Sequence, residues 1–326
     1  MVTRRGWLAA AGGWAALAAT GSGARAQAWP AKPITLIVPY PPGGLNDVVA
    51  RAFAEKLTQL LGVAVIVDNK AGAATTVASN LVAKAPPDGY TIYGGGTSLV
   101  INPTLQGNVQ YHPFDSFEPV SLMSVTPFIL QVHSAVPAKD VKELIALIRA
   151  NPGKYNIATS GIGATNFMLA ELFKDMAKLD MTVVPYRGGA PAAQDLGAGI
   201  AQMMFSASLE AAPLLARGAT RPLAISSAKR SPAFPDLPTM EEATGLTGFA
   251  AEFWQCLVVP KGTPKPIIDR LQAAIAAVVA DKEIKERFAK QGVDLVASTP
   301  KELHELMVRE EKRWSTLIRE KGIKPE

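Results

Sequence analysis

Runs of residues with strand-like and helix-like patterns alternate along this chain, and the alternation limits the folds open to it. One series extends from "ITLIVPY" (34–40) to "YTIYGG" (90–95), and a second from "VKELIALIRA" (141–150) to "RPLAISS" (221–227). Strands and helices alternating at this spacing predict βαβ units, which form mostly parallel sheets with helices on their faces. The sequence therefore predicts an α/β protein with two lobes.

Two extended stretches connect the series. "FEPVSLMSVTPFILQVH" (117–133) joins the first series to the second, and "GFAAEFWQCLVVP" (248–260) leads back to a helical C-terminal part. We expect one lobe to contain residues 27–125 and 250–326, and the other residues 126–249. Ligands of open α/β sheets bind beyond the carboxyl ends of the strands. Two extended crossings at one place predict a hinge that closes such a cleft.

The N-terminus has the layout of a secretory signal. Arg4 and Arg5 precede the uncharged run Gly6–Thr20, and small residues suited to cleavage end at Ala26 or at Ala28. The adjacent arginines resemble a twin-arginine signal, although ordinary export signals also contain arginine pairs. A membrane anchor is the alternative, but the run is shorter than the ~20 residues of a bilayer span. We expect the leader to be removed and the mature protein to lie in the periplasm.

Removing residues 1–26 changes the charge of the chain. It takes away three arginines and no acid, which lowers the formal net charge from +5 to +2. A nearly neutral mature chain has no electrostatic footprint for nucleic acid. The single cysteine, Cys256, rules out an intramolecular disulfide, and its apolar neighbours predict a core position.

The stretch "VPYPPGGLNDVVAR", Val38–Arg51, predicts a strand, a stiff turn and a helix in succession. The first N–H groups of a helix have no internal partner, and the helix dipole adds positive charge there. Gly43 and Gly44 lack side chains that would keep a ligand away from these groups. Asn46 or Asp47 can cap the helix, which we expect from Asp47 onward. The turn therefore predicts an anion site made of backbone.

The second series repeats this arrangement in "YNIATSGIGATNFMLAELF" (155–173). Ser160, Gly161 and Gly163 follow a strand, and Thr165 begins a helix. A glycine turn between a strand and a helix is also ordinary structure. Two such turns, one in each lobe of an exported protein, favour one small anion held between them.

An exported enzyme is the main competing interpretation. "GIGATN" partly matches a dinucleotide-binding turn, but its third glycine and the later ribose-binding acid are absent. His112, His133 and His304 lack metal-ligand spacing, and no G-x-S-x-G turn occurs. We therefore predict no enzyme activity, cofactor or metal.

Three charged residues have both functional and structural interpretations. Asp88 and Asp195 could act as a carboxylate pair, but Asp88 fits a turn and Asp195 fits a helix brace. Arg187 lies in a glycine-rich turn and could face a ligand, whereas a brace between lobes or a solvent position is the simpler role. A periplasmic sensor for a signalling partner would use the same fold and stays open.

The order of several motifs resembles one known family, the substrate-binding receptors of tripartite tricarboxylate transporters, or Bug receptors. The motifs cover the mature chain: "VPYPPGGLNDVVAR", "VIVDNKAGAATTVASNLVAKAPPDGYTI", "TSLVINPTL", "SGIGATNFMLAELF", "VVPYRGGAPAAQDLGAG" and "RPLAISSAKRSPAFPDLPTMEEATG".

This resemblance implies a monomeric periplasmic receptor with a flytrap fold, which binds a small carboxylate and delivers it to membrane components. It also implies that the loops Tyr40–Asp47 and Ser160–Asn166 hold the carboxylate without an arginine clamp. The chain departs from the family at Phe167, where many members have histidine, and at Ser206-Ala207, where many have Asp-Asn. A less polar far end of the pocket follows, and the ligand could be a mono-, di- or tricarboxylate, an amino acid or an aromatic acid. The ligand-binding residues expected are Tyr40, Gly43, Gly44, Asn46, Asp47, Ser98, Ser160, Gly161, Gly163, Thr165, Asn166 and Ser206.

Overall fold

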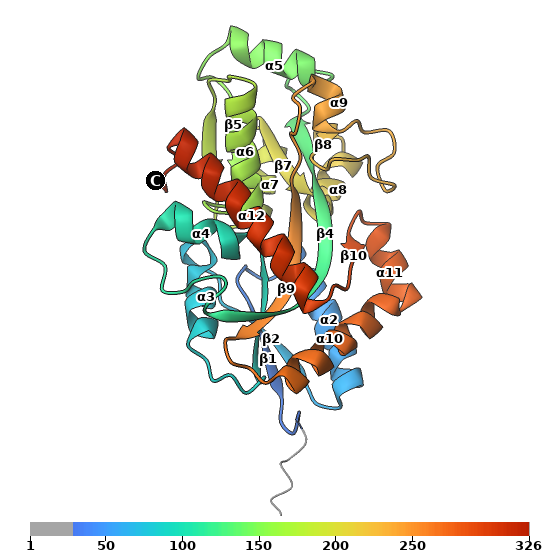
Figure 1. The fold of residues 1–326 in the computed structure, drawn as a ribbon. Coiled ribbons are helices and arrows are strands. Elements are labelled where there is room, and N and C mark those ends of the chain that lie inside the picture. The colour runs from blue at the N-terminus through green and yellow to red at the C-terminus, as the bar shows by residue number, and fades with distance from the viewer. Residues whose placement is uncertain (1–28, 326) are drawn as a thin grey trace, which may run out of the picture.

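The computed structural model describes residues 29–325, so the predicted leader lies outside the described residues. Strands and helices alternate through most of the chain, as the sequence predicts (Figure 1). The strands are β1 (Ile34–Val38), β2 (Val65–Asn69), β3 (Thr91–Gly96), β4 (Phe117–His133), β5 (Asn156–Thr159), β6 (Thr182–Pro185), β7 (Met203–Ala207), β8 (Thr220–Ile225), β9 (Glu252–Pro260) and β10 (Asp294–Leu295).

The helices flank these strands. They are α2 (Leu45–Leu61), the 3₁₀ turn η1 (Ala73–Thr75), α3 (Thr76–Ala83), α4 (Ser98–Gln106), α5 (Val141–Ala150), α6 (Thr165–Met176), α7 (Gly189–Gly197), α8 (Ser208–Ala216), α9 (Met240–Thr244), α10 (Lys265–Ala280), α11 (Lys282–Ala289) and α12 (Pro300–Lys321).

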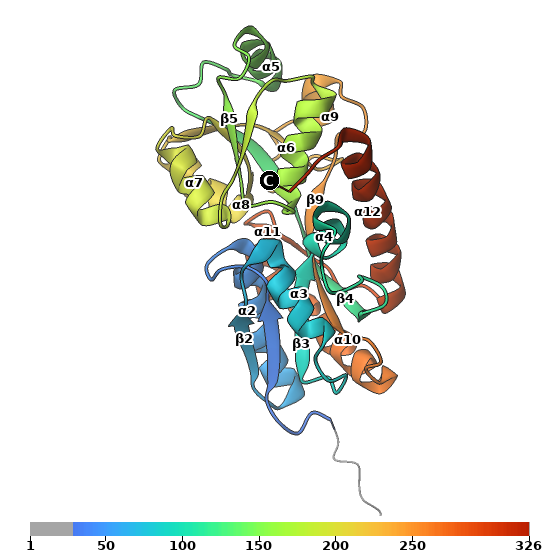
Figure 2. The same cartoon turned by 90° about the vertical axis from the view of Figure 1, so that its left-hand side faces the viewer.

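Each lobe contains three parallel strands and is completed by antiparallel ones. The strand order is β2-β1-β3-β9-β4-β7-β5-β6, with β8 and β10 also paired to β4. β1, β2 and β3 are parallel in one lobe, and β5, β6 and β7 are parallel in the other. β9 and β4 run antiparallel to their neighbours, because they cross between the lobes instead of following a βαβ crossover. Figure 2 shows the two lobes one above the other. The two-lobed α/β fold is confirmed.

The predicted extended stretch 117–133 is a single strand, β4. Its first part, Phe117–Pro127, pairs with β9, and its second part, Phe128–His133, pairs with β7 and β8. The ladder between β4 and β9 has two register shifts, between Pro119 and Ser121 and between Leu122 and Ser124. Bulges of this kind bend and twist a strand locally. The connection between the lobes is therefore a paired strand and not a loop.

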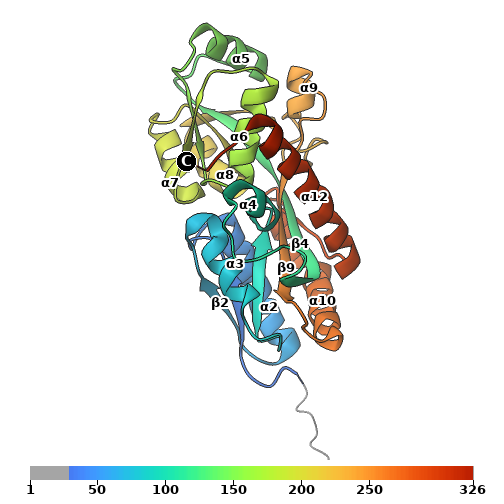
Figure 3. The ribbon, with the colours of Figure 1, turned by 60° about the vertical axis from the view of Figure 1, so that its left-hand side comes forward.

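The long helix α12 packs against both lobes. It contacts α4 and β4 on one side and α6 on the other, and Figures 1 and 3 show it running obliquely across them. Leu303, Met307 and Trp314, which the sequence places on one face, are buried there. Burying a large apolar side chain stabilises the fold by about 1.5–3 kcal/mol.

Two helices that begin beside the cleft differ from the sequence prediction, and α9, away from it, was also not predicted. α2 begins at Leu45, two residues before the predicted Asp47, so Asn46 and Asp47 lie inside its first turn instead of capping it. α8 was not predicted, because the segment between the strands β7 and β8 is short and contains Pro213. Both differences affect the cleft, since α2 and α8 each begin beside it.

Candidate ligand-binding cleft

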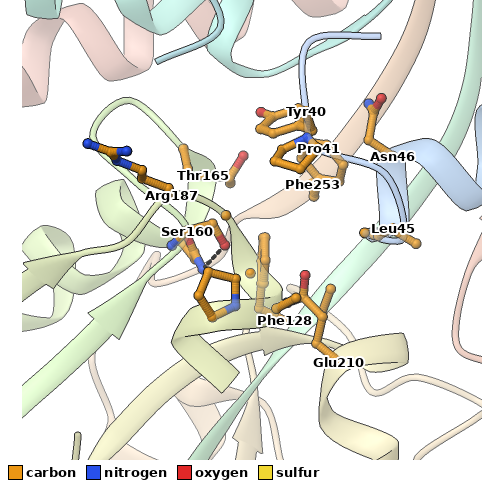
Figure 4. Close-up of a pocket in the computed structure, with 18 of the residues that line it drawn as sticks. Tyr40, Pro41, Leu45, Asn46, Phe128, Ser160, Thr165, Arg187, Glu210 and Phe253 are labelled. Atoms are coloured by element: carbon orange, nitrogen blue, oxygen red, sulfur yellow. Dashed lines mark hydrogen bonds between the residues drawn. The ribbon is translucent and has the colours of Figure 1, made fainter. Parts of the chain in front are cut away.

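Two adjoining cavities lie between the lobes. The first has an empty volume of about 630 Å³, part of which is open to solvent. The second is wider and shares six lining residues with the first, so the two form one cleft. Figure 4 shows the first cavity. The shared residues are Tyr40, Pro41, Ser160, Ala164, Arg187 and Gly188.

Four helices begin at the first cavity. Their N-cap residues are Gly44 of α2, Ala164 of α6, Gly188 of α7 and Ala207 of α8, and all four line it. Among the described residues, none of these four N-cap residues has a side chain that accepts a hydrogen bond from a backbone N–H of its helix. The helices α5, α9, α11 and α12, which start elsewhere, each have such a cap, whereas α3, α4 and α10 also lack one. Free N–H groups and positive dipole ends therefore meet at the cleft, as an anion site requires.

The turn before α2 is held in shape by Asp47. The Gly43 N–H and Arg51 Nε both donate to Oδ2 of Asp47 at 2.9 Å, and Asn69 Nδ2 donates to Oδ1 at 2.9 Å. Burial alone would raise the pKa of Asp47, but these hydrogen bonds and the Arg51 charge outweigh it and lower the pKa. Gly43 has a φ of +88°, a conformation that favours glycine. Asp47 thus supports the turn, and it occupies the Gly43 N–H that we expected to face the ligand.

Tyr40 joins this turn to α4. The Tyr40 and Ser98 hydroxyls lie 2.6 Å apart, and the Tyr40 ring meets the edge of Phe253 with centroids 6.2 Å apart. Burial raises the pKa of Tyr40 to about 12, although the hydrogen bond with Ser98 acts against the shift. Tyr40 therefore stays neutral at physiological pH. Ser98 lines the second cavity.

The turn before α6 is organised by Asn166. Its Nδ2 donates to Ser160 Oγ at 2.9 Å and to the Phe205 carbonyl at 3.1 Å, while its Oδ1 accepts from the Ser160 N–H at 3.1 Å. Both side-chain ends of Asn166 are thus used within the protein. Thr165 lines the same cavity, and its buried Oγ1 has no partner among the described residues. Thr165 is therefore available to a ligand.

The glycines of this second turn are needed for packing. A Cβ on Gly161 would lie 2.9 Å from the Tyr186 carbonyl, and one on Gly163 would overlap the Asn102 side chain. Gly161 lines the second cavity, whereas Gly163 faces Asn102.

Eight of the twelve residues expected to bind ligand line one of the two cavities. The other four are Gly43, Asp47, Gly163 and Ser206, which have internal contacts and are absent from both linings. Ser206 is buried and accepts a 2.6 Å hydrogen bond from Gln131 Nε2. Phe167 is likewise absent from both linings and packs in the core. The eight that line the cleft are Tyr40, Gly44, Asn46, Ser98, Ser160, Gly161, Thr165 and Asn166.

Sequence reasoning missed Glu210, which lies in the first turn of α8 and lines the first cavity. Burial raises its pKa to about 7, against a backbone hydrogen bond from Ala207 that favours the ionised form. Its Oε2 is buried and has no partner among the described residues. Phe128 and Phe253 also line this cavity and were not predicted. All three come from segments without a local motif, which is why pattern reasoning did not find them.

Arg187 lines both cavities but is exposed. Figure 4 shows its guanidinium directed away from Tyr40, Asn46 and Glu210. Asp195, the other charged residue considered near this turn, accepts a 2.7 Å hydrogen bond from the Tyr186 hydroxyl. Within residues 29–325, no group of three or more His, Cys, Asp or Glu side chains is arranged to hold a metal ion.

A two-lobed α/β fold whose cleft is lined by helix N-termini without side-chain caps is the architecture of solute-binding proteins. A family model described as "Tripartite tricarboxylate transporter family receptor" matches residues 49–323. The chain belongs to this family of receptors. The resemblance of its motifs to the Bug receptors is thereby confirmed. None of the helices within residues 29–325 is both long and apolar enough for a bilayer span.

Curated relatives match nearly the whole chain. A protein encoded in the tcbD-tcbE intergenic region of Pseudomonas sp. strain P51 is 37% identical over 93% of this chain and 91% of its own length. Protein BugT of Bordetella pertussis is 34% identical over 97% of this chain and 98% of its own length.

Solved structures share the fold at similar identity. The periplasmic binding protein BugD is 32% identical, with a TM-score of 0.85 over 91% of this chain and 100% of its own. Rpa4515 of R. palustris, solved with adipate, is 32% identical, with a TM-score of 0.87 over the same shares. MatC of Rhodopseudomonas palustris, solved with malate, is 31% identical, with a TM-score of 0.83 over 89% of this chain and 100% of its own.

Proposed function

We propose that this protein is a periplasmic receptor that captures one small organic carboxylate between its lobes. The convergence of four helix N-termini on one cavity, of which those of α2 and α6 have no acidic side chain among the described lining residues, carries this proposal. Such backbone donors bind carboxylates through charge-assisted hydrogen bonds. The ligand carboxylate lies between the start of α2 in one lobe and the start of α6 in the other, so that closing the lobes completes the site.

Backbone and hydroxyl groups hold the carboxylate in this proposal, and an arginine clamp does not. Arg187 is the only cationic side chain among the described residues that line either cavity, and it is exposed. Thr165 Oγ1 is buried without a partner in the described part of the chain and Tyr40 is neutral, so both can hydrogen-bond to a ligand. We expect an affinity around micromolar or tighter, equivalent to about −8 kcal/mol.

The adipate and malate in the related structures support a carboxylate as the ligand class. Membership of the receptor family supports delivery of the ligand to membrane components of a tripartite tricarboxylate-type transporter. Export through the leader at residues 1–26 and action as a monomer complete the proposal. The lobe boundaries, 27–125 with 250–326 and 126–249, remain part of it, and the change of β4 partners after Pro127 supports them.

A thermal-shift screen of the purified protein against organic carboxylates tests this function. A ligand that binds only the folded state stabilises it by about 2.7 kcal/mol at 100 times its Kd. We expect at least one small carboxylate to raise the melting temperature, with sugars and metal salts as negative controls. A panel in which only sugars or metal ions stabilise the protein would disprove the proposal.

A further inference from the structure

Glu210 places an acidic group inside a cavity that otherwise attracts anions. Among residues 29–325, it is the only acidic side chain in the lining of either cavity. A Cβ added to Gly189 would lie 1.9 Å from Glu210 Oε1, so the carboxyl group rests against the bare backbone at the start of α7. Glu210 itself belongs to the first turn of α8. Its carboxyl group therefore already occupies the anion-attracting ends of two of the four helices.

The remaining two helix starts differ in what they offer. The starts of α2 and α6 have no acidic side chain in the cavity lining, and Asp47 of α2 is turned away to Arg51 and Asn69. A ligand carboxylate therefore fits at α2 and α6. A second ligand carboxylate at α7 and α8 would meet Glu210, and like charges at close range repel each other.

An unpartnered atom beside α7 and α8 indicates what the second ligand group must be. Glu210 Oε2 is a buried oxygen without a hydrogen-bond partner among the described residues, and the Glu210 side chain lines the cavity. When Glu210 is ionised it only accepts hydrogen bonds, so a ligand group that pairs with the ionised form has to donate. A protonated amine has three N–H donors and no acceptor, and it also neutralises a carboxylate.

The aromatic residues that line the cavity also suit a protonated amine. Phe128 and Phe253 line the cavity with ring centroids 6.4 Å apart, and Phe128 pairs across the sheet with Ala207, the residue that precedes α8. Figure 4 shows Glu210 beside Phe128. Aromatic faces attract ammonium groups through their quadrupole, whereas a carboxylate is attracted only by the ring edges.

We propose that Glu210 is the specificity-determining residue of the cleft, and that it selects a ligand bearing a protonated amine as well as a carboxylate. The ligand class is therefore a zwitterion of amino-acid type, and dicarboxylates such as those bound by the adipate and malate relatives are disfavoured. This inference rests on the proposed function, because it assumes that the ligand carboxylate lies at α2 and α6.

Isothermal titration with ligands of matched carbon skeleton tests this selection. The five-carbon set is pentanoate, 2-aminopentanoate, 5-aminopentanoate and glutarate, with the corresponding six-carbon set beside it, so that both positions of the amine are sampled. The wild-type protein is compared with Glu210→Gln, which keeps the shape of the side chain and removes its charge. Glu286→Gln, an exposed acid on α11 away from the cleft, is the matched control.

We expect one amino acid to bind the wild-type protein at least about tenfold more tightly than its deaminated and dicarboxylate counterparts, as a desolvated charge pair allows. Glu210→Gln should reduce this ratio to about one, and Glu286→Gln should leave it unchanged. Preferred binding of glutarate or adipate by the wild type, or an amine preference that persists in Glu210→Gln, would overturn the inference and leave the proposed function intact. Failure of every carboxylate to bind would overturn both. Circular dichroism checks folding, and the wild-type ratios decide the question if the glutamine variant does not fold.

Discussion

Replacing Gly44 by valine separates binding at the start of α2 from folding. Gly44 has φ −79° and ψ 169°, an extended conformation that β-branched residues adopt readily. A Cβ there would have the Pro41 carbonyl oxygen, at 4.0 Å, as its nearest neighbour. We therefore expect Gly44→Val to change the free energy of unfolding by no more than ~1 kcal/mol, with loss of glycine flexibility in the unfolded chain offsetting the poorer N-cap.

The effect on binding should be much larger. The valine side chain would occupy cavity space in front of the free N–H groups of α2, and each charge-assisted hydrogen bond lost costs about 1.5–3 kcal/mol. The loss of one such bond weakens binding about ten- to hundredfold, and the loss of two makes a micromolar ligand undetectable by calorimetry.

Gly43→Val is the matched comparison, because it introduces the same side chain at the neighbouring position. Gly43 has φ +88°, so valine is strained there and should lower the melting temperature where Gly44→Val does not. Ser160→Ala should weaken binding modestly, since it removes one hydroxyl group, and Arg187→Ala should change it little. Titration calorimetry with the best carboxylate of the screen, together with thermal unfolding, measures both effects. If Arg187→Ala abolishes binding while Gly44→Val binds normally, the ligand is held by a cationic clamp and the backbone mechanism is wrong.

Three further predictions concern the groups that shape the cleft. Burial raises the pKa of Glu210 from 4.5 to about 7, so the folded protein binds more protons than the unfolded chain between these values and its stability falls as pH rises through them. The free energy of unfolding of Glu210→Gln, relative to that of the wild type, should therefore be higher at pH 8 than at pH 4, by up to about 3 kcal/mol. Urea unfolding without ligand measures this difference. The pKa of Asp47 is lowered, so its contribution is present above the ordinary carboxyl pKa and is lost as pH falls. Asp47→Ala should destabilise the protein by about 3 kcal/mol at pH 7 and by less at pH 3; an equal loss at both pH values would show that its charge is unimportant. Asn166→Ala leaves the Ser160 N–H and the Phe205 carbonyl without partners and should cost about 2–3 kcal/mol in chemical unfolding, whereas an unchanged midpoint would show that the turn holds without it.

The sequence predicted the fold well because its strongest signals are periodic. Alternating strands and helices gave the two lobes, and the apolar run 117–133 gave the long strand β4 within its observed bounds. Helix α8 was missed, because Pro213 and the short spacing between strands hide its period.

The candidate site was predicted less completely, since a motif locates a side chain along the chain but not its direction. Asp47 and Gly43 belong to the predicted turn, yet they bind each other and not the cavity. Glu210 has no motif around it, and only the packing of α8 against the start of α7 brings it into the cleft. Ser160 and Thr165 were found because the glycine turn that exposes them is itself a sequence signal.

The long strand β4 determines how fast the backbone amides in the connection between the lobes exchange their hydrogens with solvent. Because β4 is paired with β9 up to Pro127 and with β7 and β8 from Phe128 onward, rotation of the lobes twists a ladder and breaks few of its hydrogen bonds. Amides near Val125 should then exchange slowly in deuterated water whether or not ligand is present. A joint made of loops would exchange quickly in the ligand-free protein, whereas here the ligand should protect mainly the turns before α2 and α6.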